Sequence, residues 1–329
     1  MKQVMYTAEQ VKALIEQGKN LILAGDENVL RKLPTGNWIG GTIPYFMAEE
    51  GGRFDQTNIY VTELPDYIKN NFIIVYDEFN LNRVYTDIPE NGMGFILIPA
   101  ACNTHLSFSL NAPGFEKFAF KPLLGWITGV NLADLGKVSP KVFNGESGKV
   151  IEDGAVVFHM QLPENKISDM SIVNVFEQGQ GDTFTFPEDG FQVTDVYVNG
   201  QKQNFADYLL ENKIDTKLPL VADYYGASVN VSFQQIDKDA RRVDLYAPVF
   251  QNVEYRCAQP VEDYVNLFES NMPKDDVDSI FFSCNCILNY LYSELENKQT
   301  GGITGPITFG EIAYQLLNQT MVYLTIMDK

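Results

Sequence analysis

The feature that most constrains the fold is a continuous apolar run, GMGFILIPA, at residues 92–100. A strand with one face in water alternates apolar and polar residues, whereas a strand covered on both faces reads as an unbroken apolar run. The run therefore predicts a sheet with material packed on both of its faces. In a chain of 329 residues, this requires layers of helices or further sheets around it.

Other segments predict helices and strands that alternate along the chain. Residues 7–20 carry an apolar stripe behind a capping pair, Thr7 and Gln10, which predicts a short amphipathic helix. The pair Asn199-Gly200 follows an alternating run and predicts a hairpin. Because hairpins occur beside strand–helix–strand segments, the predicted fold class is α/β (α+β), with mixed sheets flanked by helices.

The length favours two domains, because a domain usually contains about 100 to 200 residues. A polar, glycine-bearing segment at residues 176–190 is the weakest stretch of the pattern. We therefore predict two lobes, residues 1–180 and residues 181–329. Similar strings at residues 38–52 and 302–315 place glycines ahead of Thr, Ile, Pro and an aromatic residue, which suggests that the lobes are related by internal duplication.

The charge of the chain excludes one class of partner. The sequence has 24 Lys and Arg against 43 Asp and Glu, a formal net charge of −19. Such a surface repels a phosphate backbone unless a basic patch exists, and the sequence contains no Lys/Arg cluster. We therefore expect no nucleic-acid partner, whereas a basic protein partner remains compatible with this charge.

Targeting signals and cysteine usage indicate a compartment. No run of eighteen apolar residues is present, and the first residues are charged and polar where a secretory signal would be apolar. The four cysteines are too few and too irregularly spaced for a disulfide framework, which fits a reducing compartment. The sequence therefore predicts a cytoplasmic protein with no membrane partner.

Histidine is scarce, which limits the chemistry that the chain can perform. The two histidines, His105 and His159, cannot supply a histidine-rich zinc site and leave few bases for a catalytic triad. A P-loop around Gly148-Lys149 lacks both the earlier glycine and the Ser or Thr that should follow the lysine. We therefore expect no metal and no cofactor, and we assign no catalytic residue.

Two cysteine positions nevertheless keep a catalytic alternative open. Cys284 ends an apolar run just before a predicted helix, where the helix dipole would lower the pKa of its thiol. Cys102 and His105 are three residues apart, so one helical turn would place thiol and imidazole on the same face. Either arrangement is compatible with a thiol-dependent enzyme, and packing as small hydrophobic residues explains the cysteines equally well.

Glycine-rich segments suggest a ligand site. The segments at residues 36–42 and 301–305 could turn consecutive N–H groups toward an anion, or could simply form tight turns. Neighbouring aromatic residues would form apolar walls, and Glu311 places a carboxyl group in an otherwise apolar strand. The candidate ligand-binding residues are Trp38, Gly40, Thr42, Cys284, Gly310 and Glu311.

The last fifty residues resemble a known family. The order FFSCNC, a helix, GPITFGEIA and a closing strand is similar to the C-terminal module of FIST domains, in which Ser283-Cys284 and Gly310-Glu311-Ile312 match the pattern. The string GNWIGGTIPYF at residues 36–46 is similar to the partner module. The resemblance implies a FIST-like sensory protein, with one module in each lobe, that binds a small molecule such as an amino acid and couples to a signalling protein.

Three functions from different classes follow. The first is a cytosolic small-molecule-binding protein with its pocket at the junction of the two lobes. The second is a thiol-dependent enzyme that uses Cys284 or the pair Cys102 and His105. The third is a structural or scaffolding protein, in which the acidic surface serves solubility or a basic partner.

Overall fold

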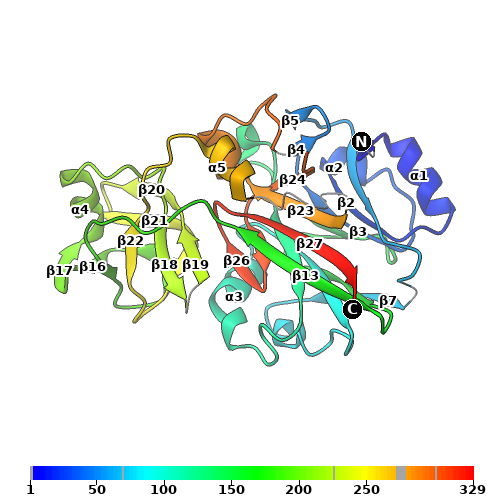
Figure 1. Cartoon of the computed structure of the whole chain (residues 1–329), viewed down its shortest axis with the longest axis horizontal. Coiled ribbons are helices and arrows are strands. Elements are labelled where there is room, and N and C mark those ends of the chain that lie inside the picture. Colours follow the sequence, from blue (N-terminus) through cyan, green and yellow to red (C-terminus); the bar gives the residue numbers. More distant parts are fainter. Residues whose placement is uncertain (1–2, 69, 225–226, 272–278, 301) are drawn as a thin grey trace. The chain divides into compact units, whose positions relative to one another are not determined.

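A computed structural model describes residues 3–68, 70–224, 227–271, 279–300 and 302–329 (Figure 1). By contacts, the chain divides into two compact units. Unit 1 comprises Met1–Ile172, Met272–Gln315 and Met321–Lys329, and unit 2 comprises Val173–Asn271 and Leu316–Thr320. This grouping differs from the predicted halves divided after residue 180, because strands near both ends of the chain belong to the same sheets of unit 1.

The described residues of unit 1 form three mixed sheets, whose edge strands also include Val173, Leu316 and Leu317 of unit 2. The first has the strand order β1 (Met5–Tyr6), β6 (Ile59–Glu63), β2 (Leu21–Gly25), β3 (Trp38–Thr42), β10 (Val142–Asn144) and β11 (Lys149–Ile151). The second has the order β26 (Gln315–Leu317), β25 (Glu311–Ala313), β9 (Leu123–Thr128), β8 (Gly92–Pro99), β12 (Ala155–Gln161) and β7 (Asn71–Tyr76). The third has the order β13 (Lys166–Val173), β27 (Met321–Asp328), β23 (Ile280–Cys286), β24 (Gly305–Thr308), β4 (Tyr45–Ala48) and β5 (Gly51–Phe54).

These three sheets share one strand pattern. At the centre of each, two parallel strands are joined through a helix: β2 and β3 through α2 (Glu27–Leu30), β8 and β9 through α3 (Asn103–Asn111), and β23 and β24 through α6 (Ile287–Tyr292). The two strands that follow each pair then join a different sheet, as β4–β5, β10–β11 and β25–β26 do. The chain order of unit 1 therefore repeats three times, and unit 2 is inserted into the third repeat, between β13 and β23 (Figure 1).

The internal similarity seen in the sequence lies within this repeat. Residues 38–52 hold β3, β4 and the start of β5, and residues 302–315 hold β24, β25 and the start of β26. The two strings thus occupy equivalent positions in the first and third repeats of unit 1, rather than one position in each of two lobes. The equivalent segment of the second repeat, β9 to β11, shares the arrangement without sharing the sequence.

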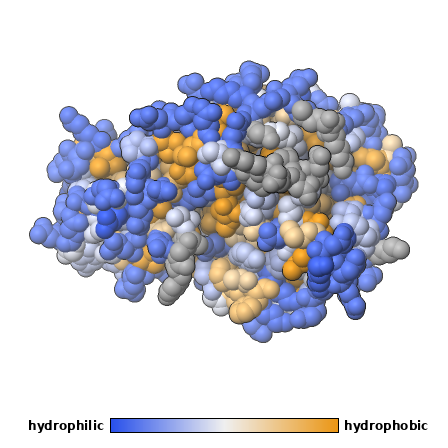
Figure 2. All heavy atoms as spheres, in the orientation of Figure 1, coloured by the Kyte–Doolittle hydropathy of each residue, from blue (hydrophilic) through white to orange (hydrophobic). Residues whose placement is uncertain are grey.

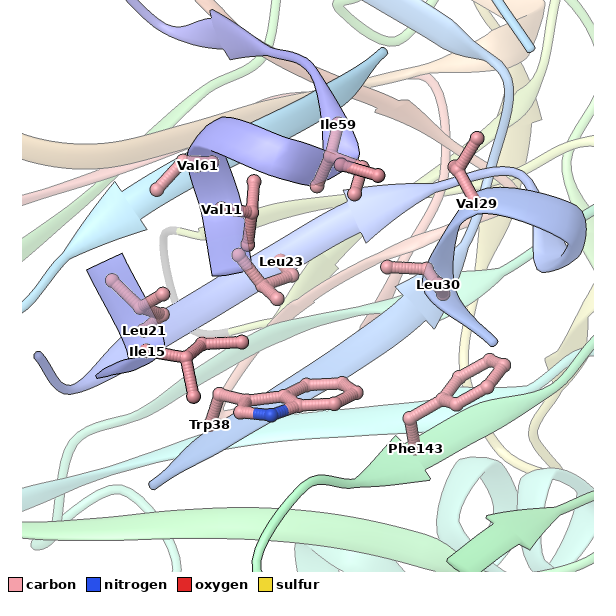
Figure 3. Close-up of a cluster of buried hydrophobic side chains, with 11 residues drawn as sticks. Val11, Ile15, Leu21, Leu23, Val29, Leu30, Trp38, Ile59, Val61 and Phe143 are labelled. Atoms are coloured by element: carbon pink, nitrogen blue, oxygen red, sulfur yellow. The ribbon is translucent and has the colours of Figure 1, made fainter. Parts of the chain in front are cut away.

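The expected mixed α/β architecture is confirmed, and two local predictions hold in detail. All eight residues of β8 are buried, as its unbroken apolar run predicts. Helix α1 (Ala8–Glu16) begins with the predicted capping pair: Thr7 Oγ1 accepts from the Gln10 N–H, and the Gln10 side chain accepts from the Thr7 N–H. Val11 and Ile15 of α1 are buried in a hydrophobic cluster over β2 and β3 (Figure 3).

Unit 2 contains two sheets and two helices among its described residues. One sheet has the order β17 (Gln201–Asn204), β16 (Asp195–Val198), β14 (Phe184–Thr185), β22 (Tyr255–Cys257), β18 (Leu220–Tyr224) and β19 (Ala227–Val231). The other has the order β15 (Gly190–Val193), β21 (Arg242–Val249) and β20 (Phe233–Asp237), and the helices are α4 (Phe205–Glu211) and α5 (Tyr264–Asn271). The predicted Asn199-Gly200 hairpin is confirmed between β16 and β17, with both residues at positive φ, 48° and 82°.

The face of the molecule drawn in Figure 2 is largely polar. Separate hydrophobic patches interrupt it. Among the described residues, no helix combines the length and the apolar character that crossing a bilayer requires.

Candidate functional site

The first glycine-rich segment is a strand and not a bend. Gly40 and Gly41 lie within β3, and their backbone takes part in the ladders to β2 and β10. The predicted turn toward an anion is therefore wrong for this segment. Packing requires a glycine at position 41, because a Cβ there would lie 2.6 Å from Thr128 Cγ2 and 3.2 Å from Trp126 Nε1.

Trp38 belongs to the hydrophobic core under α1. Its side chain is 3% exposed, and its Nε1 donates a hydrogen bond of 2.9 Å to the Pro34 carbonyl. Figure 3 shows the indole ring between Ile15 and Phe143, and the ring centroids of Trp38 and Phe143 are 6.3 Å apart. A Cβ on Gly40 would lie 3.2 Å from the same indole ring, so Gly40 lines this core as well.

The candidates from the third repeat gather around β9. Glu311 lies on β25, directly opposite Trp126 in the antiparallel ladder, and is completely buried. The Thr308 hydroxyl lies 3.0 Å from Glu311 Oε1 and 3.2 Å from the Gly310 carbonyl oxygen. The Cys284 thiol lies 3.7 Å from the carbonyl oxygen of Gly125, the residue before Trp126. The structure therefore brings Cys284, Gly310 and Glu311 together.

Thr42 adjoins this group through the end of β9. Its carbonyl accepts a 2.8 Å hydrogen bond from the Gly129 N–H, and its hydroxyl accepts a 2.9 Å bond from the Lys141 N–H. Thr42, Thr128 and Thr308 are the last residues of β3, β9 and β24, so they hold equivalent positions in the three repeats. All three side chains are buried. We call the buried set Thr128, Trp126, Cys284, Thr308 and Glu311 the polar centre.

Two groups of the polar centre lack hydrogen-bond partners. Trp126 Nε1 and Thr128 Oγ1 are buried and form no hydrogen bond with the residues that the structure describes. A buried polar group without a partner costs about 1 to 3 kcal/mol, and in native proteins such groups usually meet a water, an ion or a ligand. The polar centre is therefore a place where a further polar molecule would add stability.

A hollow adjoins the polar centre at Cys284. It measures about 10 Å³, room for about one water molecule. Its lining combines apolar and polar side chains from β4, β23, β24 and the segment before β24: Met47, Ser283, Cys284, Asn285, Thr300, Ile303, Thr304, Gly305, Ile307 and Met321. A depression beside it, without room for a water molecule, shares Met47, Thr300, Ile303 and Thr304 of its lining with the hollow.

Sequence reasoning missed most of the polar residues in this lining. Ser283 and Asn285 flank Cys284 in β23, and Thr304 accepts a 2.6 Å hydrogen bond from the Ser283 hydroxyl through its carbonyl. The available signal was the polar pair inside the apolar run IFFSCNC, because a fully buried strand normally excludes Ser and Asn. Of the second glycine-rich segment, Gly301 lies outside the described residues, and Gly305 belongs to β24.

The thiol chemistry predicted for Cys284 meets an opposing environment. Burial raises the pKa of the Cys284 thiol well above its usual value, and the neighbouring Glu311 carboxylate raises it further. Cys286, and not Cys284, is the residue that precedes the first turn of α6. The predicted lowering of the pKa by the helix dipole is therefore wrong.

The second thiol candidate is also held as a neutral group. Cys102 precedes α3 and accepts the His105 N–H on its sulfur, and burial raises the pKa of its thiol to about 11. The His105 imidazole accepts from the Ala101 N–H through Nδ1, and burial lowers the pKa of the ring to about 4. Among the described residues, no three His, Cys, Asp or Glu side chains gather where they could hold a metal ion.

These pKa directions give an expected result for thiol labelling. Below about pH 8, iodoacetamide should label the cysteines of the folded protein much more slowly than those of the denatured protein. The reason is that burial raises the pKa of Cys102 and Cys257 to about 11 and holds the pKa of Cys284 well above its usual value, while Cys286 is buried. Mass spectrometry of timed samples, with the urea-denatured chain as the control, measures this. Rapid labelling of Cys284 or Cys102 in the folded protein would instead favour the thiol-dependent enzyme.

Comparison with known proteins places the chain in a family. A family model with the description "Family of unknown function (DUF6976)" matches residues 6–327. The match begins in β1 and ends in β27, so it takes in all three repeats of unit 1 as well as unit 2. A search of curated proteins found no match. The chain therefore belongs to the DUF6976 family.

Proposed function

We propose that the protein binds a small polar metabolite, and that the ligand site is the hollow beside Cys284 together with the polar centre behind it. The observation that carries this proposal is the pair of buried polar-centre groups that have no hydrogen-bond partner among the described residues, Trp126 Nε1 and Thr128 Oγ1. A third member of the polar centre, Cys284, lines the hollow. Ligand pockets combine apolar walls with a few convergent polar groups, and this place has both. The site lies entirely within unit 1.

The size of the hollow sets a condition on binding. Pockets for small organic ligands usually measure several hundred Å³, so a metabolite needs more space than the single water volume present. Met47 and Ile303 line the hollow and the depression beside it, and we propose that a rotation of these two side chains widens the hollow for a ligand. Methionine is suited to this role, because its unbranched side chain adopts many rotamers at little cost.

The ligand that we propose is an amino acid or a related metabolite with an ammonium group. Glu311 supplies a buried carboxyl group, and buried charges in proteins are stable when they are paired and hydrogen-bonded. The Thr308 and Ser283 hydroxyls and the Asn285 amide can complete the polar contacts. The resemblance to FIST modules favours the same class of ligand, a signalling protein as a further partner, and a cytoplasmic location, in which the four free thiols stay reduced.

The direct test is thermal unfolding in the presence of single amino acids and their common derivatives. A ligand at 100 times its dissociation constant should stabilise the wild type by about 2.7 kcal/mol. In Glu311→Gln, which keeps the shape but removes the charge, the same ligand should add far less. The matched control is Glu90→Gln, a neutralised carboxylate whose side chain is exposed and does not line the hollow, and it should respond like the wild type.

Two outcomes would contradict the proposal. One is that no compound of this class changes the unfolding temperature of the wild type. The other is that Glu311→Gln responds to a ligand as strongly as Glu90→Gln does, which would place the binding site elsewhere. Because each protein is compared with itself with and without ligand, any loss of stability from the substitution alone does not affect the result.

A further inference from the structure

Strand β7 is an open edge of the second sheet. It pairs with β12 on one side and is the last strand in the sheet order, so no described strand covers its other side. Its sequence, NFIIVY, contains no charged residue, no glycine and no proline. Phe72 is 42% exposed and Val75 is 38% exposed. Figure 1 labels this strand near the C-terminus.

The hydrogen-bond pattern shows which backbone groups face outward. The Gln161 N–H donates a hydrogen bond to the Asn70 carbonyl. Because hydrogen-bonded and non-bonded pairs alternate along an antiparallel ladder, the residues of β7 that bond to β12 are Phe72, Ile74 and Tyr76. The N–H and C=O groups of Asn71, Ile73 and Val75 therefore point away from the sheet. They form no hydrogen bond with other described residues.

The equivalent edges of the other two sheets are protected. The strand in the same position is β1 in the first sheet, which has only two residues, and β13 in the third sheet, which carries Lys166 and Asp169. Very short strands and charged side chains are the usual means by which proteins prevent pairing at a sheet edge. Since β7 has neither, its edge is open where its two counterparts are closed.

We propose that β7 pairs antiparallel with β7 of a second copy of this chain, so that the second sheet continues through a two-fold symmetric dimer. With the two-fold axis at Ile73, the outward groups of Asn71 meet those of Val75 in the other copy, and Ile73 meets Ile73. All outward groups of both strands are then satisfied. The same register places Phe72 opposite Ile74, an aromatic and β-branched pair of the kind that stabilises sheets.

The flanks of β7 complement each other in this arrangement. An antiparallel dimer brings the first (N-terminal) end of each β7 strand against the last (C-terminal) end of the other. At the first end, Lys166 lies over the Tyr67 ring, with its Nζ 5.3 Å from the ring centroid. At the last end follow Asp77, Glu78 and then Phe79, which is 85% exposed. The Lys166 charge is already paired with Asp328, at 2.9 Å, so the complementarity comes from the aromatic rings. The register with its axis at Ile73 places the exposed Tyr67 of one copy opposite the exposed Phe79 of the other, which favours a second copy as the occupant.

The size of the contact determines how strong the dimer is. A six-residue strand is about 20 Å long, and one strand pair with its flanks falls at the small end of protein interfaces. The dimer should therefore dissociate on dilution, with a dissociation constant in the micromolar range. The proposal is independent of the ligand site, because β7 contributes no residue to the hollow.

Sedimentation velocity over a range from low to several hundred micromolar protein tests the dimer. The wild type should shift from monomer to dimer as concentration rises. Val75→Lys places a charge at the edge and should remain monomeric throughout, and so should Ile73→Pro, which removes an outward N–H but no bond to β12. The control is Ile167→Lys, the same change at an exposed site on β13, which should dimerise like the wild type.

Amide hydrogen exchange gives a residue-level readout of the same contact. The amides of Ile73 and Val75 should exchange quickly in dilute wild type and slowly in concentrated wild type. The amide of Ile74, which is bonded to β12, should be protected at both concentrations. A protein that stays monomeric at every concentration would overturn the proposal. So would a dimer that persists in Val75→Lys and Ile73→Pro, and so would one that Ile167→Lys also abolishes.

Discussion

Replacing Gly125 with alanine is expected to destabilise the protein by about 3 kcal/mol or more, because the new methyl group has no space. Gly125 lies in β9, between β8 and β25, directly beside Ile96 in the parallel ladder. A Cβ at this position would overlap the Ile96 carbonyl oxygen and lie 2.7 Å from its carbon and 2.9 Å from the Ile96 nitrogen. These are backbone atoms, so relief requires β9 to move away from β8 and break the ladder that supports the polar centre.

Thermal unfolding measures this effect, and a loss of this size should lower the midpoint by about 4 °C or more. The matched control is Gly114→Ala, because a Cβ at Gly114 would meet nothing within 4 Å. That variant should unfold within about 0.5 kcal/mol of the wild type. Equal midpoints for the two variants would mean that β8 and β9 lie further apart than the structure places them.

Local features of the fold could be predicted because they depend on neighbouring residues. The unbroken apolar run of β8, the capping pair at Thr7 and the Asn199-Gly200 hairpin each follow from a few consecutive side chains. The glycines of β3 show the limit of this reasoning. The sequence favours a bend at Gly40 and Gly41. In the structure both lie in a strand, and Gly41 is required there because Thr128 and Trp126 of another repeat approach it closely.

The threefold repeat could not be read from the sequence, because its copies share an arrangement rather than residues. The first and third repeats still share the pattern of glycine, threonine and proline that the sequence revealed. In the second repeat, the equivalent strand β9 reads LLGWIT, and it shares little of this pattern with the other repeats beyond its last residue, Thr128. The insertion of unit 2 into the third repeat further hides the period, since it separates β13 from β23 by about a hundred residues.

The candidate site was predicted in part. Cys284, Gly310 and Glu311 follow one another closely in the last repeat and meet around Thr308. Trp38 and Gly40 face the hydrophobic cluster formed with α1 and α2 instead, because the side chains of a strand alternate between its two faces and these two positions share one face. The contribution of β9 depends on pairing between distant strands, which no local pattern indicates.

Acidification from pH 7 to pH 4 is expected to destabilise the protein by about 3 kcal/mol through His159 alone. Burial lowers the pKa of this histidine from 6.5 to about 4, and the charge of Asp87 opposes the shift only partly. The unfolded chain therefore binds a proton as the pH falls through 6.5, while the folded protein does not bind it until about pH 4. Stability is complete above pH 6.5 and is lost progressively below it.

The surroundings of His159 explain why the folded protein resists the proton. The side chain is fully buried, and its Nε2 lies 2.8 Å from the Tyr76 hydroxyl, which donates in turn to Asp87. Phe72 stacks over the ring at a centroid distance of 5.0 Å. Nδ1 has no hydrogen-bond partner among the described residues, so a proton there would create a buried charge with no acceptor.

Urea unfolding at several pH values between 7 and 4 measures this dependence in the wild type and in His159→Gln. In the variant, unfolding should no longer be coupled to the uptake of a proton at position 159. The free energy of unfolding should therefore fall less steeply with pH than in the wild type, by as much as about 1.4 kcal/mol per pH unit. His105→Gln is the control: it removes the other imidazole, whose pKa is also lowered to about 4, and leaves the His159 contribution in place. Asp55 titrates outside this window, because hydrogen bonds from Thr57 and Asn58 hold the pKa of its carboxyl at about 2.

Parallel pH profiles for the wild type and His159→Gln would show that His159 already takes up its proton in the folded protein. Tyr76 and Asp87 would then have to supply the charge compensation that a fully buried imidazolium needs.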